Sequence, residues 1–261
     1  MRWMRNALGK AAAGWLLCCA TIVPATAELR FAFEPSSRFG GADDSSVLTM
    51  RGEIELGDRE RLLAFVLENR QTFIDHADRV AFVIDGGDVL EAMEIGRFLG
   101  DALLEAWLPD VGSTRCVSAC FLMFAAAAAR SAQPDTVGIH RPYFSPRAVA
   151  QAEPGEVRER YGETFDAVRA YLDELFVPKT LSERMLSAES SDIYWLSEQD
   201  IAQLGRRQSW FADFVEARCG GEDGECLSGY LRAHRAAIVR KLADGVFRHL
   251  DAGQSPPVEV R

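Results

Sequence analysis

The stretch VAFVIDGGDVLEAMEIGRFLGDALLEAW, residues 80–107, decides the fold class. It begins with an uninterrupted apolar run, Val80 to Ile84, which is typical of a strand buried on both faces of a parallel sheet. A turn, Asp85 to Asp88, contains two glycines, and a long amphipathic helix, Val89 to Trp107, follows it. The segment therefore predicts a strand, a turn and a helix of an α/β domain.

The same order of elements recurs on both sides of this segment. Val47 to Ile54 alternates like a strand, and Asp58 can cap the helix that follows it. Downstream, short strands are expected at Thr114 to Val117 and Thr136 to Ile139, with an apolar helix, Ala119 to Ala129, between them. Strands that alternate with helices predict an α/β fold with a mainly parallel sheet.

The remainder of the chain is expected to be mainly helical. A charged helix with a wide solvated face, Val157 to Phe176, is closed by Pro178. A short helix, an extended piece and a second short helix are expected after it, at Leu181 to Leu186, Ile193 to Leu196 and Glu198 to Leu204. A final helix, Leu227 to Leu250, precedes a proline-rich end that is expected to be disordered.

The N-terminus, Met1 to Ala27, has the pattern of a cleavable secretory signal peptide, with basic residues, an apolar core and small residues at the cleavage site. The apolar core is short for a membrane span, so an uncleaved anchor is the less favoured alternative. We therefore expect an exported protein, periplasmic or secreted. The predicted division is a signal peptide (1–27), an irregular lead (28–45), one α/β domain (46–205) and a C-terminal helical extension (206–261).

The charge of the chain narrows the class of partner. Residues 1–27 contain three basic and no acidic residues, so the rest of the chain has 26 Lys+Arg against 39 Asp+Glu and a net charge of −13. An acidic surface repels phosphate backbones, which argues against nucleic acid as a partner.

Four cysteines follow the signal peptide, and an even number in an exported protein predicts disulfides. Three connectivities are open, of which the local pairing Cys116–Cys120 plus Cys219–Cys226 is the simplest. A zinc site is the less favoured alternative, because no histidine is close in sequence and the spacings are not those of paired short zinc loops. No metal is expected.

Three motifs could form a reactive site at the ends of the predicted strands. Ser118 lies at the junction of a strand and an apolar helix, where it is either a helix N-cap or a nucleophile beside the amide of Ala119. His140 ends a strand, as either a structural hydrogen-bonding residue or a general base. Gly86 and Gly87 either form a tight turn or offer amides to an oxyanion. A dinucleotide or phosphate loop lacks its third glycine and its lysine here.

Taken together, these motifs resemble the Clp protease proteolytic subunit, whose clan also includes signal peptide peptidase A and the crotonase fold. The segment Cys116 to Cys120, with His140-Arg141-Pro142, is more closely similar to exported Clp-like proteins of bacteria. The resemblance covers about Leu48 to Gly205. It implies repeated ββα and βα units around a mainly parallel sheet, with the charged helix as a projecting handle and the C-terminal helix as an addition.

The resemblance also implies roles for individual residues. Ser118 matches the nucleophile and His140 the general base, while the amides of the Gly86-Gly87 pair and Ala119 match the oxyanion hole. Asp192 matches the third catalytic residue, although its spacing differs by one residue, so that Ser191 or no acid at all remains open.

The resulting expectation is an exported serine hydrolase, a peptidase that works without ATP, a cofactor or an ATPase partner. Its substrates would be peptides or unfolded protein segments, and the handle helix implies self-association into a homo-oligomer. One alternative is a binding or assembly protein of the periplasm that has this fold without turnover. A crotonase-type acyl-thioester enzyme is disfavoured, because coenzyme A is a cytoplasmic cofactor.

Overall fold

The computed structural model describes residues 28–41, 45–109, 114–144, 149–150, 153–221 and 224–245. The expected signal peptide, Met1 to Ala27, and the proline-rich end lie outside the described residues. Within the described ranges, no helix combines the length and the apolar character that a membrane span requires.

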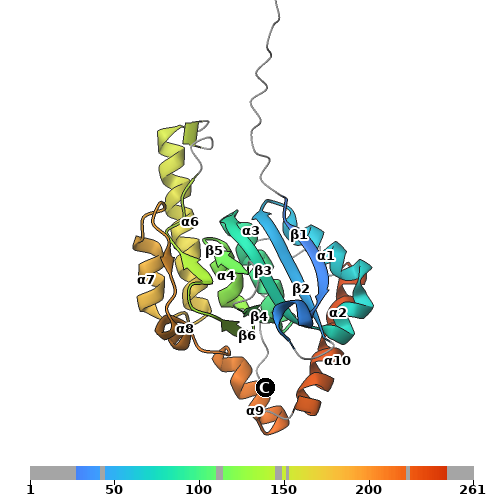
Figure 1. Cartoon of the computed structure of the whole chain (residues 1–261). Coiled ribbons are helices and arrows are strands. Elements are labelled where there is room, and N and C mark those ends of the chain that lie inside the picture. Colours follow the sequence, from blue (N-terminus) through green and yellow to red (C-terminus); the bar gives the residue numbers. More distant parts are fainter. Residues whose placement is uncertain are drawn as a thin grey trace, which may run out of the picture.

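A mainly parallel sheet forms the centre of the molecule (Figure 1). Its main path runs β1-β2-β3-β5-β7-β8, in which β2, β3, β5 and β7 are parallel and the edge strands β1 and β8 are antiparallel to their neighbours. These strands are β1 (Arg30–Pro35), β2 (Ser46–Ile54), β3 (Ala77–Gly87), β5 (Arg115–Val117), β7 (Val137–Ile139) and β8 (Tyr194–Trp195). The expected mixed α/β fold with a mainly parallel sheet is confirmed.

Two further strands branch from this path. β4 (Glu105–Leu108) pairs in parallel with the first part of β3, and β6 (Ala129–Ala132) pairs in parallel with β4. The central strand β3 is buried along its middle, where Val80, Phe82 and Ile84 have no exposed surface. The continuous apolar run in the sequence is thus the buried middle of the sheet.

Helices α3 (Val89–Asp101) and α4 (Cys120–Ala126) pack against each other, and α4 also contacts β3 and β5. Every residue of α4 is buried, as its wholly apolar sequence requires. Helices α1 (Asp58–Glu68) and α2 (Arg70–His76) connect β2 to β3, and the 3-10 helix η1 (Ser36–Phe39) follows β1.

Helix α6 (Pro154–Glu174) projects from the body of the molecule (Figure 1). The buried residues of this helix, Val168, Tyr171 and Leu172, all lie in its C-terminal half. The Tyr171 hydroxyl donates to the carbonyl oxygen of Met93 at 3.2 Å, and burial raises the pKa of this hydroxyl so that it keeps its proton. Helices α7 (Lys179–Ser187) and α8 (Glu198–Leu204) follow, and the bounds of α8 agree with the prediction.

The C-terminal extension folds back on the N-terminal helices. It consists of α9 (Ser209–Cys219) and α10 (Gly224–Ala243), and α10 packs against α1 and α2. Arg235, 1% exposed, fixes this contact by pairing with Asp78 at 2.8 Å and donating to the carbonyl oxygen of Ile74 at 3.2 Å. The extension is therefore packed onto the α/β domain.

In two places the sequence predicts one long helix, whereas the structure has a shorter helix followed by a strand. The helix expected at Val89 to Trp107 ends at Asp101, because Leu103 takes a left-handed φ of 56° and the chain then joins the sheet as β4. The helix expected at Ala119 to Ala129 ends at Ala126, and β6 follows it.

The expected irregular lead, residues 28–45, contains strand β1, which the sequence analysis missed. Phe31 and Phe33 alternate onto one face of this strand and contact Phe65, with ring centroids 5.9 and 5.3 Å apart. Helix α9 was also missed, because it falls in a stretch with little amphipathic periodicity.

Candidate functional site

Ser118 occupies a sharp turn between β5 and α4. Its φ of 59° lies in the left-handed region, which costs a non-glycine residue about 1–3 kcal/mol. Its amide donates to the carbonyl oxygen of Gly138 at 2.9 Å, and its own carbonyl oxygen accepts from the amide of Phe121 at 2.9 Å. Helix α4 begins at Cys120 with Ala119 as its N-cap residue, so the N-cap interpretation of Ser118 is wrong.

The two glycines at the end of β3 lie against this turn. A Cβ atom on Gly86 would be 3.0 Å from Cβ of Ser118 and 3.3 Å from its Oγ, and one on Gly87 would be 2.2 Å from the carbonyl oxygen of Ile54. Both glycines have φ values near 135°, which side chains rarely allow. The structure thus places the Ser118 side chain directly against the backbone of Gly86.

His140 follows β7, the neighbour of β5 in the sheet. The parallel pairing of Val117 with Gly138 brings Ser118 and His140 to the same edge of the sheet, where the carboxyl ends of these strands meet. His140 is 5% exposed, and the ring of Tyr143 lies beside its imidazole with the centroids 5.8 Å apart. Ser118 and His140 therefore follow the carboxyl ends of neighbouring strands, and their pairing as nucleophile and base stays a prediction.

A main-chain contact selects the tautomer of His140. Its Nδ1 lies 2.9 Å from the carbonyl oxygen of Arg141, which can only accept. The hydrogen bond therefore requires the proton on Nδ1 and leaves Nε2 able to accept one.

Asp192 lies in the turn before β8, and its side chain is exposed. Its amide donates to the carbonyl oxygen of Glu189 at 3.0 Å, while its carboxylate makes no hydrogen bond or ion pair with any other described residue. The neighbouring Ile193 and Trp195 do reach β7, since a Cβ atom on Gly138 would be 2.6 Å from Ile193 Cγ2 and 3.3 Å from the Trp195 ring. The third catalytic role of Asp192 stays a prediction.

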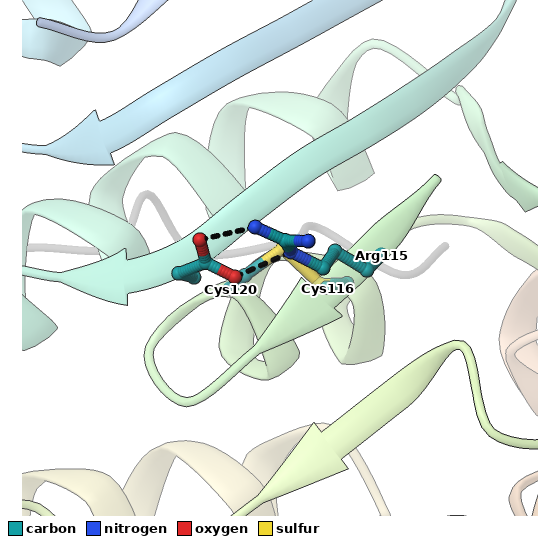
Figure 2. The surroundings of a disulfide bond; sticks show 4 residues. Arg115, Cys116 and Cys120 are labelled. Atoms are coloured by element: carbon teal, nitrogen blue, oxygen red, sulfur yellow. Dashed lines mark hydrogen bonds and ion pairs between the residues drawn. A yellow bond between two sulfur atoms is a disulfide. The ribbon is translucent and has the colours of Figure 1, made fainter. Parts of the chain in front are cut away.

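A disulfide joins Cys116 and Cys120 (Figure 2), two residues before and two residues after Ser118. Cys116 is the middle residue of β5 and Cys120 is the first residue of α4. Their Cα atoms are 5.1 Å apart, and neither residue has exposed surface. Closing a loop this short stabilises a fold by about 2 kcal/mol, which is comparable with the cost of the left-handed serine. The second disulfide joins Cys219 and Cys226, so the simplest pairing expected from the sequence is confirmed.

An ion pair that the sequence analysis missed lies beside the disulfide. Arg115 donates two hydrogen bonds of 2.5 Å to the carboxylate of Asp85, which links β5 to β3 one residue before Cys116 and one before Gly86 (Figure 2). These hydrogen bonds raise the pKa of Arg115. The pair is exposed and contributes only about 0–1 kcal/mol, so its main effect is geometric. In the sequence, the signal for this ion pair was Asp85, a charged residue directly after the apolar run Val80 to Ile84.

A polar cavity of about 320 Å³ lies elsewhere, between α7, β8 and α8. Its lining includes Arg184, Tyr194 and Asp200, but neither Ser118 nor His140. Burial alone would raise the pKa of Asp200, but hydrogen bonds from Ser197 and Tyr194 lower it on balance. These bonds fix the start of α8. Among the described residues, no group of three or more histidine, cysteine or acidic side chains is placed to hold a metal ion.

Comparison with protein-family models and with curated proteins gave no match. Two solved structures of variants of 1510-N, a membrane-bound stomatin-specific protease, are similar to this chain. The first is 13% identical and covers 61% of this chain and 75% of its own, with a TM-score of 0.39. The second, in complex with a substrate peptide, is 14% identical and covers 61% and 71%, also with a TM-score of 0.39. Values this low leave function to be argued from the residues of this chain.

Proposed function

We propose that the protein is a serine hydrolase, a peptidase whose nucleophile is Ser118 and whose general base is His140. The observation that carries the proposal is the left-handed Ser118 at the end of β5, beside Gly86 and on the same sheet edge as His140. A strained serine in a strand-to-helix turn is the arrangement that exposes a nucleophilic Oγ.

In the proposed reaction, Ser118 Oγ attacks a carbonyl carbon while its proton passes to Nε2 of His140. The amides of Gly87 and Ala119 donate to the oxyanion that forms. The imidazolium then gives its proton to the leaving amine as the carbon–nitrogen bond breaks, which leaves an acyl group on Ser118. A water molecule, deprotonated by His140, then attacks the acyl carbon. The imidazolium returns this proton to Ser118 Oγ as the ester bond breaks, which releases the acyl group as a carboxylic acid and restores the serine.

Two groups are candidates for orienting the imidazole of His140. The Arg141 carbonyl oxygen already accepts the Nδ1 proton, which supports a site in which the main chain orients the base. Asp192 remains the candidate implied by the Clp resemblance. The substitution Asp192→Asn separates the two, because a triad that depends on its acid loses about four orders of magnitude in rate without the carboxylate.

We also propose that the protein is exported, which limits the class of substrate. The two disulfides favour an oxidising compartment, as does the N-terminal sequence pattern. ATP is not available there, so the substrates we propose are peptides or unfolded segments that need no unfolding motor. Self-association through α6 is proposed from its projecting N-terminal half (Figure 1).

An active-site fluorophosphonate probe tests the proposal on the purified full chain. Intact-mass analysis should show one adduct on the wild type and none on Ser118→Ala. The labelling rate of His140→Ala should be at least about a hundredfold lower than that of the wild type. Ser187→Ala, which changes an exposed serine on α7, is the matched control and should label like the wild type.

A non-catalytic binding protein is the second candidate, favoured by the absence of any described contact for the Asp192 carboxylate. A folded wild type that gains no adduct at high probe concentration would support that candidate and reject the hydrolase.

A further inference from the structure

We propose that the Cys116–Cys120 disulfide positions the nucleophile, so that Ser118 reacts only while this bond is formed. The inference rests on the proposed function, because it takes Ser118 as the attacking group. It goes further by making the oxidised state of one of the two disulfides a condition of the reaction.

The two half-cystines join opposite sides of the turn. Cys116 is held in the sheet, where its amide donates to the carbonyl oxygen of Thr136 at 2.9 Å, and it pairs with Val137. Cys120 is the first residue of α4, a helix whose start has no hydrogen bond from a side-chain cap. The covalent bond is therefore the side-chain link between the start of α4 and β5, and it acts beside the main-chain hydrogen bonds that Ser118 makes with Gly138 and Phe121.

The left-handed backbone of Ser118 needs such a link. A serine released from its surroundings returns to a right-handed or extended φ, because the left-handed region is unfavourable for a side chain. Its Cβ would then leave its position against Gly86, and the amide of Ala119 would turn with it. Opening the disulfide therefore moves the nucleophile and one oxyanion donor together.

The second disulfide provides a matched control within the same chain. Cys219 and Cys226 join α9 to α10 and, like the first pair, close a short loop, with a sequence separation of 7 against 4. Both are partly exposed, whereas Cys116 and Cys120 have no exposed surface. A reductant added in steps should open Cys219–Cys226 first, so the two bonds can be distinguished in the wild type.

The experiment compares Cys116→Ala/Cys120→Ala with Cys219→Ala/Cys226→Ala in the full chain, using the fluorophosphonate probe and a p-nitrophenyl ester. The first variant should label about 100-fold more slowly, because a misplacement of about 1 Å costs that much, and its kcat should fall while KM changes little. The control variant should stay within about twofold of the wild type. Re-oxidation of reduced wild type should restore labelling.

Amide hydrogen exchange over residues 119–122 supplies a readout that does not depend on catalysis. It should speed up in the first variant and not in the control. Unchanged labelling, or unchanged exchange in this turn, overturns the positioning role. If the wild type and Ser118→Ala both fail to label, the proposed function has failed instead, and the exchange comparison still decides what the disulfide holds.

If Cys116→Ala/Cys120→Ala does not fold, stepwise reduction of the wild type replaces it. Mass analysis of alkylated thiols should then show labelling lost with the opening of Cys116–Cys120. Loss that follows the opening of Cys219–Cys226 refutes the proposal.

Discussion

Replacing Ser118 with glycine should make the protein more stable than replacing it with alanine. Both substitutions remove the hydroxyl, but alanine keeps the left-handed φ of 59° with a Cβ atom, whereas glycine adopts it freely. Relief of the left-handed conformation is worth about 1–2 kcal/mol. The greater conformational freedom of glycine in the unfolded chain lowers the free energy of unfolding by about 0.4–1 kcal/mol. The expected net difference is thus about 1 kcal/mol in favour of Ser118→Gly.

Urea titration followed by tryptophan fluorescence measures this difference, and the midpoint of thermal unfolding should differ by about 2–4 °C for a chain of this size. Ser187 on α7 is the matched control position, because its backbone is helical. There the order should reverse, with glycine about 0.5–1 kcal/mol less stable than alanine. If Ser118→Gly is no more stable than Ser118→Ala, the strained turn described here is not a property of the protein in solution.

Three other changes have defined outcomes. Gly86→Ala brings a methyl group to 3.0 Å from Cβ of Ser118, so probe labelling should fall about 100-fold, and labelling at the wild-type rate would contradict the packing. Tyr171→Phe removes the buried hydroxyl that donates to Met93 and should cost about 1 kcal/mol in urea unfolding, whereas no loss would argue against that bond. The pKa of Asp200 is lower in the folded protein than in the unfolded chain, where it is near 4. The ionised carboxylate therefore stabilises the fold above that unfolded-state pKa, and this stabilisation is lost as the pH falls through the folded-state pKa. Asp200→Asn should therefore lose less stability than the wild type between about pH 6 and pH 3, and equal losses would count against the ionised carboxylate.

The parts of the fold that follow from local sequence were predictable. In the run from Val80 to Ile84 every residue except the partly exposed Val83 is buried, so apolar residues fit there and the run is visible without a structure. The helix from Glu198 to Leu204 starts with a serine that caps it and ends at a glycine, and its bounds were predicted correctly.

The strands β4 and β6 could not be predicted in this way. β6 begins at the last of five consecutive alanines, whose helix propensity is high, and it is extended because it pairs with β4. The start of β4 depends in turn on the left-handed Leu103 and on pairing with β3. Pairing between distant segments overrides the local preference in both strands.

The same distinction separates the members of the candidate site. Ser118 and His140 follow adjacent parallel strands, so the order of the strands alone brings them to one edge. The placement of Asp192 depends on the antiparallel register of a two-residue strand, β8, in which a shift of one residue exchanges the two faces. Sequence could place the first two residues, but it could not settle the third.

The contact between Arg235 and Asp78 has a consequence for the order in which the molecule folds. The two residues are 157 positions apart, and α10 packs against α1 and α2. Contacts between segments this distant in sequence are slow to form, because the long loop between them must be closed first. The surface of α1 and α2 that α10 covers is therefore buried late, in a long-range step of folding.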